Sequence, residues 1–233
     1  MLKNLKLLFS NPKKFFIKVN NIVKYFIRLW ILRDRHLLEA KRWFKDNGDE
    51  TLRLEYELNE SSIVFDVGGY KGDFTDKIFN KFQSYIYIFE PHPRSYKNLK
   101  IKYKNNPKIK VYNYGLSDNN STISLNDLDD GSSFYKKSNK TYLCEMKEFN
   151  SIFKGLKIEK INLMKINIEG GEFSLMDNII QNNLLNRVEN YQIQFHNFVE
   201  EASRKRINII KSLKNTHNLK WCYEFVWESW KIK

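Results

Sequence analysis

The stretch that decides the fold is Ile63-Val64-Phe65-Asp66-Val67-Gly68-Gly69-Tyr70-Lys71-Gly72-Asp73, an apolar run that reaches an acid and then breaks into glycines. A second apolar run, residues 85–89, ends in Glu90. Glycine lets the backbone turn sharply and lets a ligand approach main-chain amides without a Cβ in the way. A helix that starts there offers unpaired N–H groups to an anion, and an acid ending the next strand is placed to hold two ribose hydroxyls. The pattern therefore predicts a nucleoside-cofactor site on a doubly wound α/β fold.

The turn lacks the fingerprints of a dinucleotide site and of a phosphate loop. The G-x-G-x-x-G pattern counted from Gly68 needs glycine where this chain has Tyr70 and Asp73, and no Gly-Lys-Ser/Thr follows. What fits is acid-x-Gly-x-x-x-Gly, with Asp66, Gly68 and Gly72. This spacing resembles motif I of class I S-adenosylmethionine-dependent methyltransferases, although an ordinary tight turn would share it.

Four further segments extend the likeness, at residues 89–93, 114–118, 163–172 and 192–196. Together with residues 66–75 they resemble the FkbM family of methyltransferases, over about residues 60–200. The resemblance implies methyl transfer from S-adenosylmethionine, usually to an oxygen of a sugar, polyketide, glycolipid or related product. Two positions depart from the family pattern: Tyr70 stands where Asn is common, and Asn167 where Asp is common.

Alternating strand-like and helix-like runs from residue 61 onward predict βαβ units. We expect strands near residues 62–67, 84–90, 109–114, 161–167 and 190–196, and helices near 73–82, 94–104, 171–182 and 199–213. Residues 117–150 indicate a hairpin plus a loop that would shape an acceptor pocket or a lid. The expected fold is α/β, a Rossmann-like class I methyltransferase. It has a mostly parallel sheet with helices on both faces and a C-terminal antiparallel hairpin, and a basic helical extension precedes it.

Most of the positive charge lies in this N-terminal extension. Residues 1–45 carry twelve Lys or Arg and two acids, so +10 of the net charge of +13 is found there. Asn47-Gly48 is a turn signal, and we divide the chain there into a basic amphipathic helical extension (1–48) and a methyltransferase domain (49–233). No uncharged stretch approaches the ~18–20 residues of a membrane span. Lysines and a proline interrupt any signal-peptide core.

Two interpretations of residues 1–45 stay open. The extension is either a helical cap on the catalytic domain with its lysines solvated, or an interfacial helix that meets an anionic membrane surface. A nucleic-acid partner is unlikely, because no recognised binding module is present. Cys144 and Cys222 have neither metal-ligand nor redox-motif spacing, which favours a reducing cytoplasm, although one long-range disulfide also fits. The expected location is the cytoplasm, with the inner face of the membrane as the alternative.

The candidate cofactor-binding residues lie at or just past predicted strand ends, the edge where open α/β sheets bind ligands. We expect Asp66 to orient the turn and the methionine ammonium, directly or through water. We expect Gly68, Gly69 and Gly72 to bring the backbone close to the cofactor. Glu90 would accept both ribose hydroxyls, and its structural alternative is an exposed strand-end carboxylate.

Ser117 and Asp118 form the candidate adenine site. We expect Asp118, or backbone groups around Leu116 and Ser117, to face the adenine amino group. Ser-Asp is also a common turn pair, which leaves a purely structural role open.

Methyl transfer to a sugar hydroxyl is helped by a base, because the hydroxyl is a weak acid. His196 is the first candidate, since imidazole titrates near neutral pH, and its alternative role is a core histidine bonded to backbone. Glu169 and Glu172 flank Gly170-Gly171 at a strand-to-helix turn. They are further catalytic candidates, which could bind acceptor hydroxyls, act as the base or cap the helix.

Lys165, Asn167 and Gln194 are the candidate acceptor-binding residues. Lys165 could pair with Glu169 or Glu172, or point into solvent. Asn167 can donate and accept hydrogen bonds but cannot take a proton. If the family uses a carboxylate at this position for a metal, Asn167 removes it, so we expect no essential metal.

The sequence thus predicts an O-methyltransferase acting on a sugar, glycolipid, polysaccharide-type or natural-product acceptor. The alternative is a non-catalytic cofactor- or partner-binding module that retained the fold, suggested by Tyr70 and Asn167. The acceptor and its methylated position stay open, as does a nitrogen acceptor.

Overall fold

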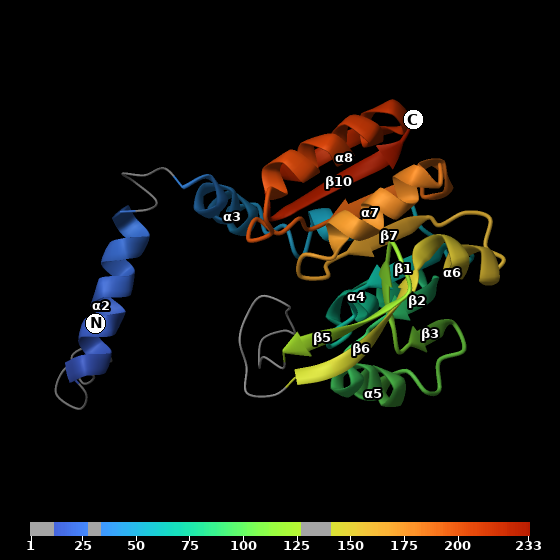
Figure 1. Ribbon diagram of the computed structural model, residues 1–233, viewed down its shortest axis with the longest axis horizontal. Helices are drawn as coiled ribbons and strands as arrows, with labels where there is room; N and C mark the ends of the chain where they lie inside the picture. Colours follow the sequence, from blue (N-terminus) through green and yellow to red (C-terminus); the bar gives the residue numbers. More distant parts are fainter. Residues whose placement is uncertain (1–11, 28–33, 127–140) are drawn as a thin grey trace.

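The computed structural model describes residues 12–27, 34–126 and 141–233. Its centre is a seven-stranded sheet in the order β3-β2-β1-β7-β8-β10-β9 (Figure 1). The strands are β1 (Ile63–Val67), β2 (Tyr85–Phe89), β3 (Ile109–Tyr112), β7 (Leu163–Ile166), β8 (Asn190–Ile193), β9 (His217–Tyr223) and β10 (Trp227–Ile232). The first five of these pair in parallel, whereas β10 runs antiparallel to both β8 and β9. The predicted α/β fold with an antiparallel C-terminal hairpin is confirmed.

Helices cover both faces of this sheet, because both faces of its central strands are apolar. The helices are α4 (Asp73–Phe82), α5 (Pro93–Lys102), α6 (Phe149–Gly155), α7 (Glu172–Gln181) and α8 (Ala202–Thr216), with 3₁₀ turns η2 (Leu52–Leu54) and η3 (Leu185–Arg187). In β1, Val64 belongs to the cluster formed with α4 and α5, whereas Phe65 and Val67 belong to the cluster formed with α6, α7 and α8. Successive side chains point to opposite faces, so a strand buried on both sides reads as one continuous apolar run.

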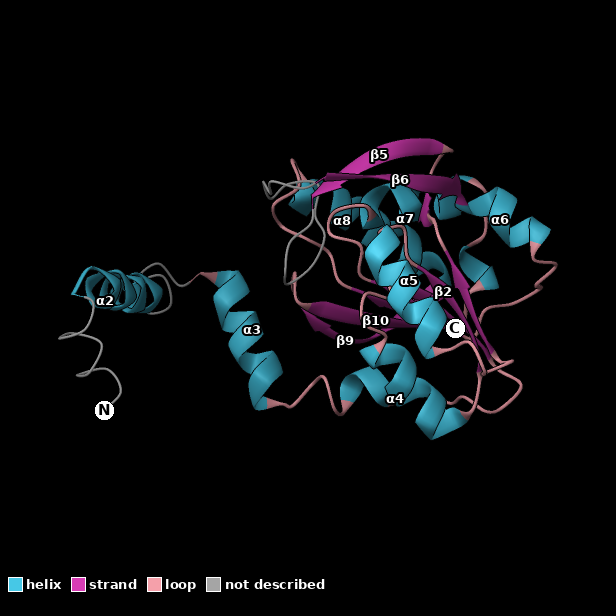
Figure 2. Ribbon diagram, turned by 90° about the horizontal axis from the view of Figure 1, so that it is seen from below, coloured by secondary structure: helices cyan, strands magenta, loops and turns pink. Residues whose placement is uncertain are grey.

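A second, three-stranded sheet stands beside the first. It has the order β4-β6-β5 and consists of β4 (Gly115–Ser117), β5 (Ser121–Asn126) and β6 (Thr141–Glu148). β5 and β6 pair antiparallel, which confirms the expected hairpin, and they run along one side of the molecule (Figure 2). The expected loop between them falls on residues 127–140, outside the described residues.

Two predicted strands are shorter in the structure. The strand expected at 109–114 ends at Tyr112, because the chain bends and Gly115–Ser117 pairs with β6 instead. The strand expected at 190–196 ends at Ile193, so that Gln194 and His196 lie in the loop after it. The predicted helices agree with α4, α5, α7 and α8 to within a few residues.

The N-terminal segment holds two helices with different surroundings. α3 (Arg35–Lys45) packs on the β9–β10 hairpin through Trp43, which is 2% exposed and makes an edge contact with Tyr223 at a ring-centroid distance of 5.1 Å. α2 (Pro12–Phe26) stands apart from the rest of the molecule in both views (Figures 1 and 2). Within the described residues, no helix is long and apolar enough to cross a membrane.

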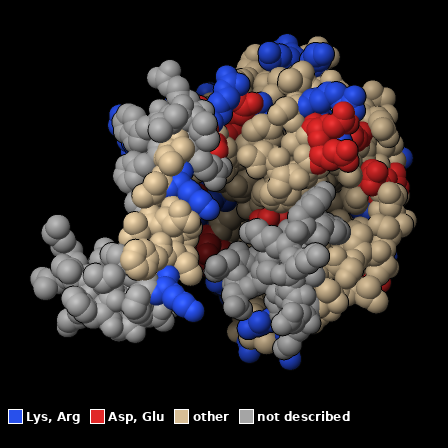
Figure 3. Space-filling view, turned by 60° about the vertical axis from the view of Figure 1, so that its left-hand side comes forward, with Lys and Arg blue, Asp and Glu red and all other residues tan. Residues whose placement is uncertain are grey.

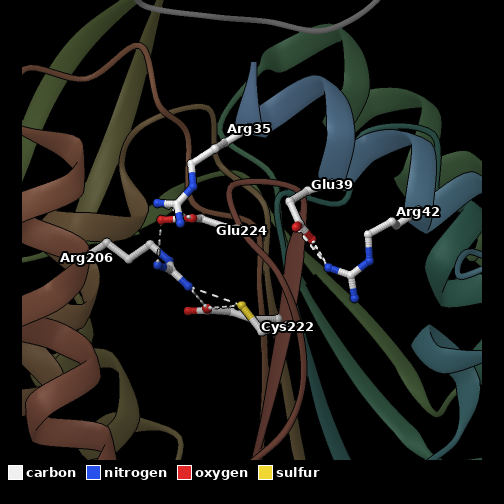
Figure 4. A network of polar contacts seen from close by, with 7 residues as sticks. Arg35, Glu39, Arg42, Arg206, Cys222 and Glu224 are labelled. Atoms are coloured by element: carbon white, nitrogen blue, oxygen red, sulfur yellow. Dashed lines mark hydrogen bonds and ion pairs between the residues drawn. The ribbon is translucent and has the colours of Figure 1, made fainter. Parts of the chain in front are cut away.

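Ion pairs also connect α3 to the body of the molecule. Glu224, in the turn between β9 and β10, lies between Arg35 of α3 and Arg206 of α8 (Figure 4). Arg206 also reaches the buried Glu228 at 2.6 Å. Arg35 is largely exposed, so its ion pair contributes little, and burial of Trp43 supplies most of the attachment.

Trp43→Ala should lower the free energy of unfolding by about 3–5 kcal/mol, because it empties a fully buried aromatic site. The matched control is Phe44→Ala, in the same helix with a side chain 75% exposed, which should change stability by less than about 0.5 kcal/mol. Urea unfolding followed by circular dichroism measures both. Equal midpoints for the two variants would contradict the packing of α3 on the hairpin.

Candidate active site

The turn after β1 has a backbone that few residues tolerate. Gly68, Tyr70 and Gly72 all have positive φ, at 85°, 47° and 82°. A Cβ added to Gly68 would lie 2.0 Å from the main-chain oxygen of Asn167. Position 68 therefore requires glycine for two reasons: its φ is positive, and the main chain just after β7 leaves no room for a Cβ.

A buried ion pair holds this turn. Lys165 Nζ lies 2.9 Å from Asp66 Oδ1 and donates to the Gly68 carbonyl at 2.7 Å, and Thr75 donates to the other Asp66 oxygen at 2.7 Å. Asp66 and Lys165 pair directly across β1 and β7, and both are buried. Burial lowers the pKa of Lys165, against the pull of the Asp66 carboxylate. The prediction that Lys165 binds the acceptor or pairs with Glu169 or Glu172 is therefore wrong, because strand register places it against Asp66.

Glu90 is fixed at the end of β2 by two main-chain donors. Its Oε2 accepts from the Tyr70 N–H at 2.8 Å and its Oε1 from the His92 N–H at 2.9 Å. The side chain is only 6% exposed, which excludes the alternative of a solvated strand-end acid. Burial raises the pKa of Glu90 above its ordinary value. Each oxygen keeps a lone pair for one more donor.

A cavity of about 470 Å³ opens between the two sheets, at the carboxyl ends of β1, β2 and β7. Among the candidate residues, those that line it are Gly68, Glu90, Ser117, Asn167 and Glu169. Tyr70 lines the cavity without filling it. The side-chain oxygen of Asn167 is buried and makes no hydrogen bond within the described structure. The space-filling view from this side shows the molecule hollowed near its centre, with acidic side chains inside (Figure 3).

Four candidate cofactor residues lie outside the cavity lining. Gly69 and Gly72 pack behind the turn, where an added Cβ would lie 2.3 Å from the Ile88 side chain and from the Tyr103 hydroxyl, respectively. Asp66 is fully buried against Lys165. These three residues therefore shape the turn by packing and ion pairing, and none of them lines the cavity.

Asp118 and Gln194 also differ from expectation. The Asp118 side chain is exposed and accepts from Ser117 Oγ at 3.0 Å and from the Asn119 amide, so it faces its own turn. Gln194 is half-buried, follows the end of β8, and is not among the residues that line the cavity. Of the Ser117-Asp118 pair, only Ser117 reaches the cavity.

The three catalytic candidates lie together. Glu172 is fully buried, and its Oε1 accepts from the His196 N–H at 2.7 Å and lies 3.1 Å from His196 Nδ1. Its Oε2 accepts from the Gly170 N–H at 2.8 Å. Glu169, with a positive φ of 51°, lines the cavity, and its Oε1 lies 3.7 Å from His196 Nε2. Glu172 is thus enclosed by internal donors and cannot face an acceptor, which corrects its prediction as acceptor ligand or base.

Part of the cavity wall was not predicted. It comes from α5, β5, β6 and α7, and consists of Ser95, Ser121, Ile123, Leu125, Met146 and Ser174. The hairpin expected at 117–150 was the available signal. The alternation of polar and apolar residues along its strands does not show which face of the hairpin lines the cavity between the two sheets. Within the described residues, no group of three His, Cys, Asp or Glu side chains is placed to hold a metal ion.

Comparison with solved structures supports the fold. A putative rRNA-methylase from Clostridium thermocellum aligns with a TM-score of 0.52 and 6% identity, over 80% of this chain and 94% of that one. SMU.1697c, a putative methyltransferase from Streptococcus mutans in complex with SAH, aligns with a TM-score of 0.50 and 10% identity, over 82% of this chain and 97% of that one. At such identities the likeness concerns the fold.

A comparison with curated proteins found no match. The model of the methyltransferase FkbM domain matches residues 66–214, well over half of the chain. This range contains the glycine turn, Glu90, the Glu169–Glu172 turn and His196. The predicted methyltransferase class and its cofactor, S-adenosylmethionine, are thereby confirmed at the level of the family: the chain belongs to the FkbM methyltransferases.

Proposed function

We propose that this protein transfers a methyl group from S-adenosylmethionine to a hydroxyl of a glycan, glycolipid or polysaccharide-type acceptor. The observation that carries the proposal is a cavity lined both by the buried carboxylate of Glu90 and by Glu169, whose Oε1 lies 3.7 Å from Nε2 of His196 behind it. The first group suits the cofactor's ribose, and the second suits a hydroxyl that must lose a proton.

The residues of the cavity fit the cofactor. Gly68 lines the cavity at a turn that has no room for a Cβ, and Glu90 presents two oxygens, each with one remaining acceptor site. Ser117 also lines the cavity and would face the adenine. The buried oxygen of Asn167 supplies an acceptor for an ammonium or a hydroxyl. The bound cofactor supplies an activated methyl group, so the protein's task is alignment and proton removal.

His196 is held in one orientation by Glu172. A carboxylate only accepts hydrogen bonds, so the contact to Glu172 Oε1 places the ring proton on Nδ1 and leaves Nε2 as the acceptor. Nε2 points toward Glu169, which lines the cavity. We therefore assign Nε2 of His196 as the base that takes the acceptor's proton, Glu169 as the group that binds the acceptor hydroxyls, and Glu172 as a positioning residue.

The side walls bear on the acceptor class. Four serines and the apolar side chains of Ile123, Leu125 and Met146 line the cavity, a mixture suited to a sugar, which has hydroxyls at its edge and C–H groups on its faces. Among the described residues on the face in Figure 3, Lys and Arg side chains stand in separate groups with acidic groups between them. A protein that binds RNA typically presents a continuous basic surface. We therefore propose a saccharide acceptor and not an RNA acceptor.

Gly68→Ala should weaken binding of S-adenosylhomocysteine at least about tenfold, or 1.4 kcal/mol, because the new Cβ displaces the turn from Asn167. The matched control is Gly155→Ala, whose added Cβ meets nothing within 4 Å. It should bind normally and change stability by no more than about 1 kcal/mol. Isothermal titration calorimetry on protein with unchanged circular dichroism is the measurement. Wild-type affinity in Gly68→Ala would refute the assigned cofactor position.

The raised pKa of Glu90 predicts a pH-dependent affinity. A protonated carboxyl group cannot accept from both ribose hydroxyls, and a raised pKa means that protonation begins at a higher pH than for an ordinary Glu. Affinity for S-adenosylhomocysteine should therefore fall as the pH is lowered, and the fall should begin at a higher pH than an ordinary Glu, with a pKa of about 4.3, would give. Glu90→Gln should bind weakly and without this dependence. Asp118→Asn should behave like the wild type. A wild-type affinity that stays constant down to the pH at which the protein begins to unfold would show that Glu90 does not bind the ribose.

His196→Ala should lower the rate of methyl transfer by about 10²–10⁴-fold while leaving affinity for S-adenosylhomocysteine unchanged, because His196 lies behind Glu169 and is not among the residues that line the cavity. The assay uses labelled S-adenosylmethionine with separate pools of saccharides, glycolipids and total RNA. Label in a saccharide or glycolipid that depends on His196 supports the proposal. Label in RNA alone would show that the acceptor is RNA and not a saccharide. Cofactor binding without transfer to any pool would favour the non-catalytic module. Glu172→Gln should give a partial loss of rate with a shifted pH profile.

A further inference from the structure

Helix α2 presents an apolar face to solvent. Val19, Val23 and Ile27 are 38%, 49% and 40% exposed. Their spacing of four residues places them along one side of the helix. The views in Figures 1 and 2 both show α2 well away from the sheet and its helices, so the body of the molecule does not cover this face.

The charge of the N-terminal segment indicates what kind of surface would cover the apolar face of α2. Residues 1–33 carry six Lys and two Arg and no acidic residue. In α2 itself, Lys13 and Lys24 are exposed and lie on the flank of the apolar side. A second copy of α2 would bring like charges together, whereas an anionic surface would neutralise them. An apolar face bordered only by positive charge is typical of a helix that lies in a membrane interface.

We propose that α2 binds the surface of an anionic lipid bilayer. Its apolar side enters the headgroup region, and its lysines meet the lipid phosphates. The helix lies in the plane of the surface, because no described helix is long and apolar enough to span. The body stays attached through α3, whose Trp43 is buried on the C-terminal hairpin. This proposal does not depend on the proposed methyl transfer, although it would bring the cavity close to lipid-linked acceptors.

The test is flotation of the purified full chain with vesicles of phosphatidylcholine plus phosphatidylglycerol, and with phosphatidylcholine alone. The wild type should float with the anionic vesicles only, and high salt should release it. Val19→Gln combined with Val23→Gln should reduce the bound fraction at least about tenfold, and Lys13→Gln combined with Lys24→Gln should reduce it in the same direction. The matched control, Asn20→Gln combined with Asn21→Gln, should float as the wild type does.

Three results would overturn the proposal. The first is a wild type that remains in the dense fraction with anionic vesicles. The second is flotation unchanged by the Val19 and Val23 substitutions. The third is self-association, measured by light scattering, that these two substitutions abolish while no flotation occurs, which would make a second copy the occupant of the apolar side. Cofactor binding by the same preparations, measured by calorimetry, separates failure of this proposal from failure of the proposed function.

Discussion

The buried ion pair between Lys165 and Asp66 is the interaction on which the site depends. Removing both charges from water is costly, and such a pair persists only when additional hydrogen bonds satisfy it. Here Thr75 and the Gly68 carbonyl supply them. The pair fixes how the chain leaves β1, and so places the N–H of Tyr70 that holds Glu90. The position of the proposed ribose-binding carboxylate thus follows from a contact that never reaches the cavity.

The acceptor side of the cavity has a similar construction. Glu172 is buried and binds His196 and the Gly170 N–H, which sets the ring orientation and the turn that carries Glu169. On both sides, a buried carboxylate with internal donors holds the residues that face the cavity. This arrangement keeps the facing groups in position without mobile side chains behind them, as preorganised sites require.

The sequence predicted the parts of this arrangement that are local. The run through Asp66 to Gly72, the second strand ending in Glu90 and the hairpin at the C-terminus each have their pattern within a few neighbouring residues. The partner of Lys165 could not be predicted, because it depends on the register of two strands whose paired residues are 99 positions apart. Glu169 and Glu172 are equally polar in sequence. The backbone conformation between them determines which side chain faces the cavity. Glu169 has a positive φ and lines the cavity, whereas Glu172 is buried.

The most direct test of this account is a crystal structure of the protein with S-adenosylhomocysteine. The account predicts both ribose hydroxyls on the Glu90 carboxylate, with the amino-acid end of the ligand along the Gly68 turn. A ligand bound elsewhere, or in the cavity with its ribose away from Glu90, would contradict it.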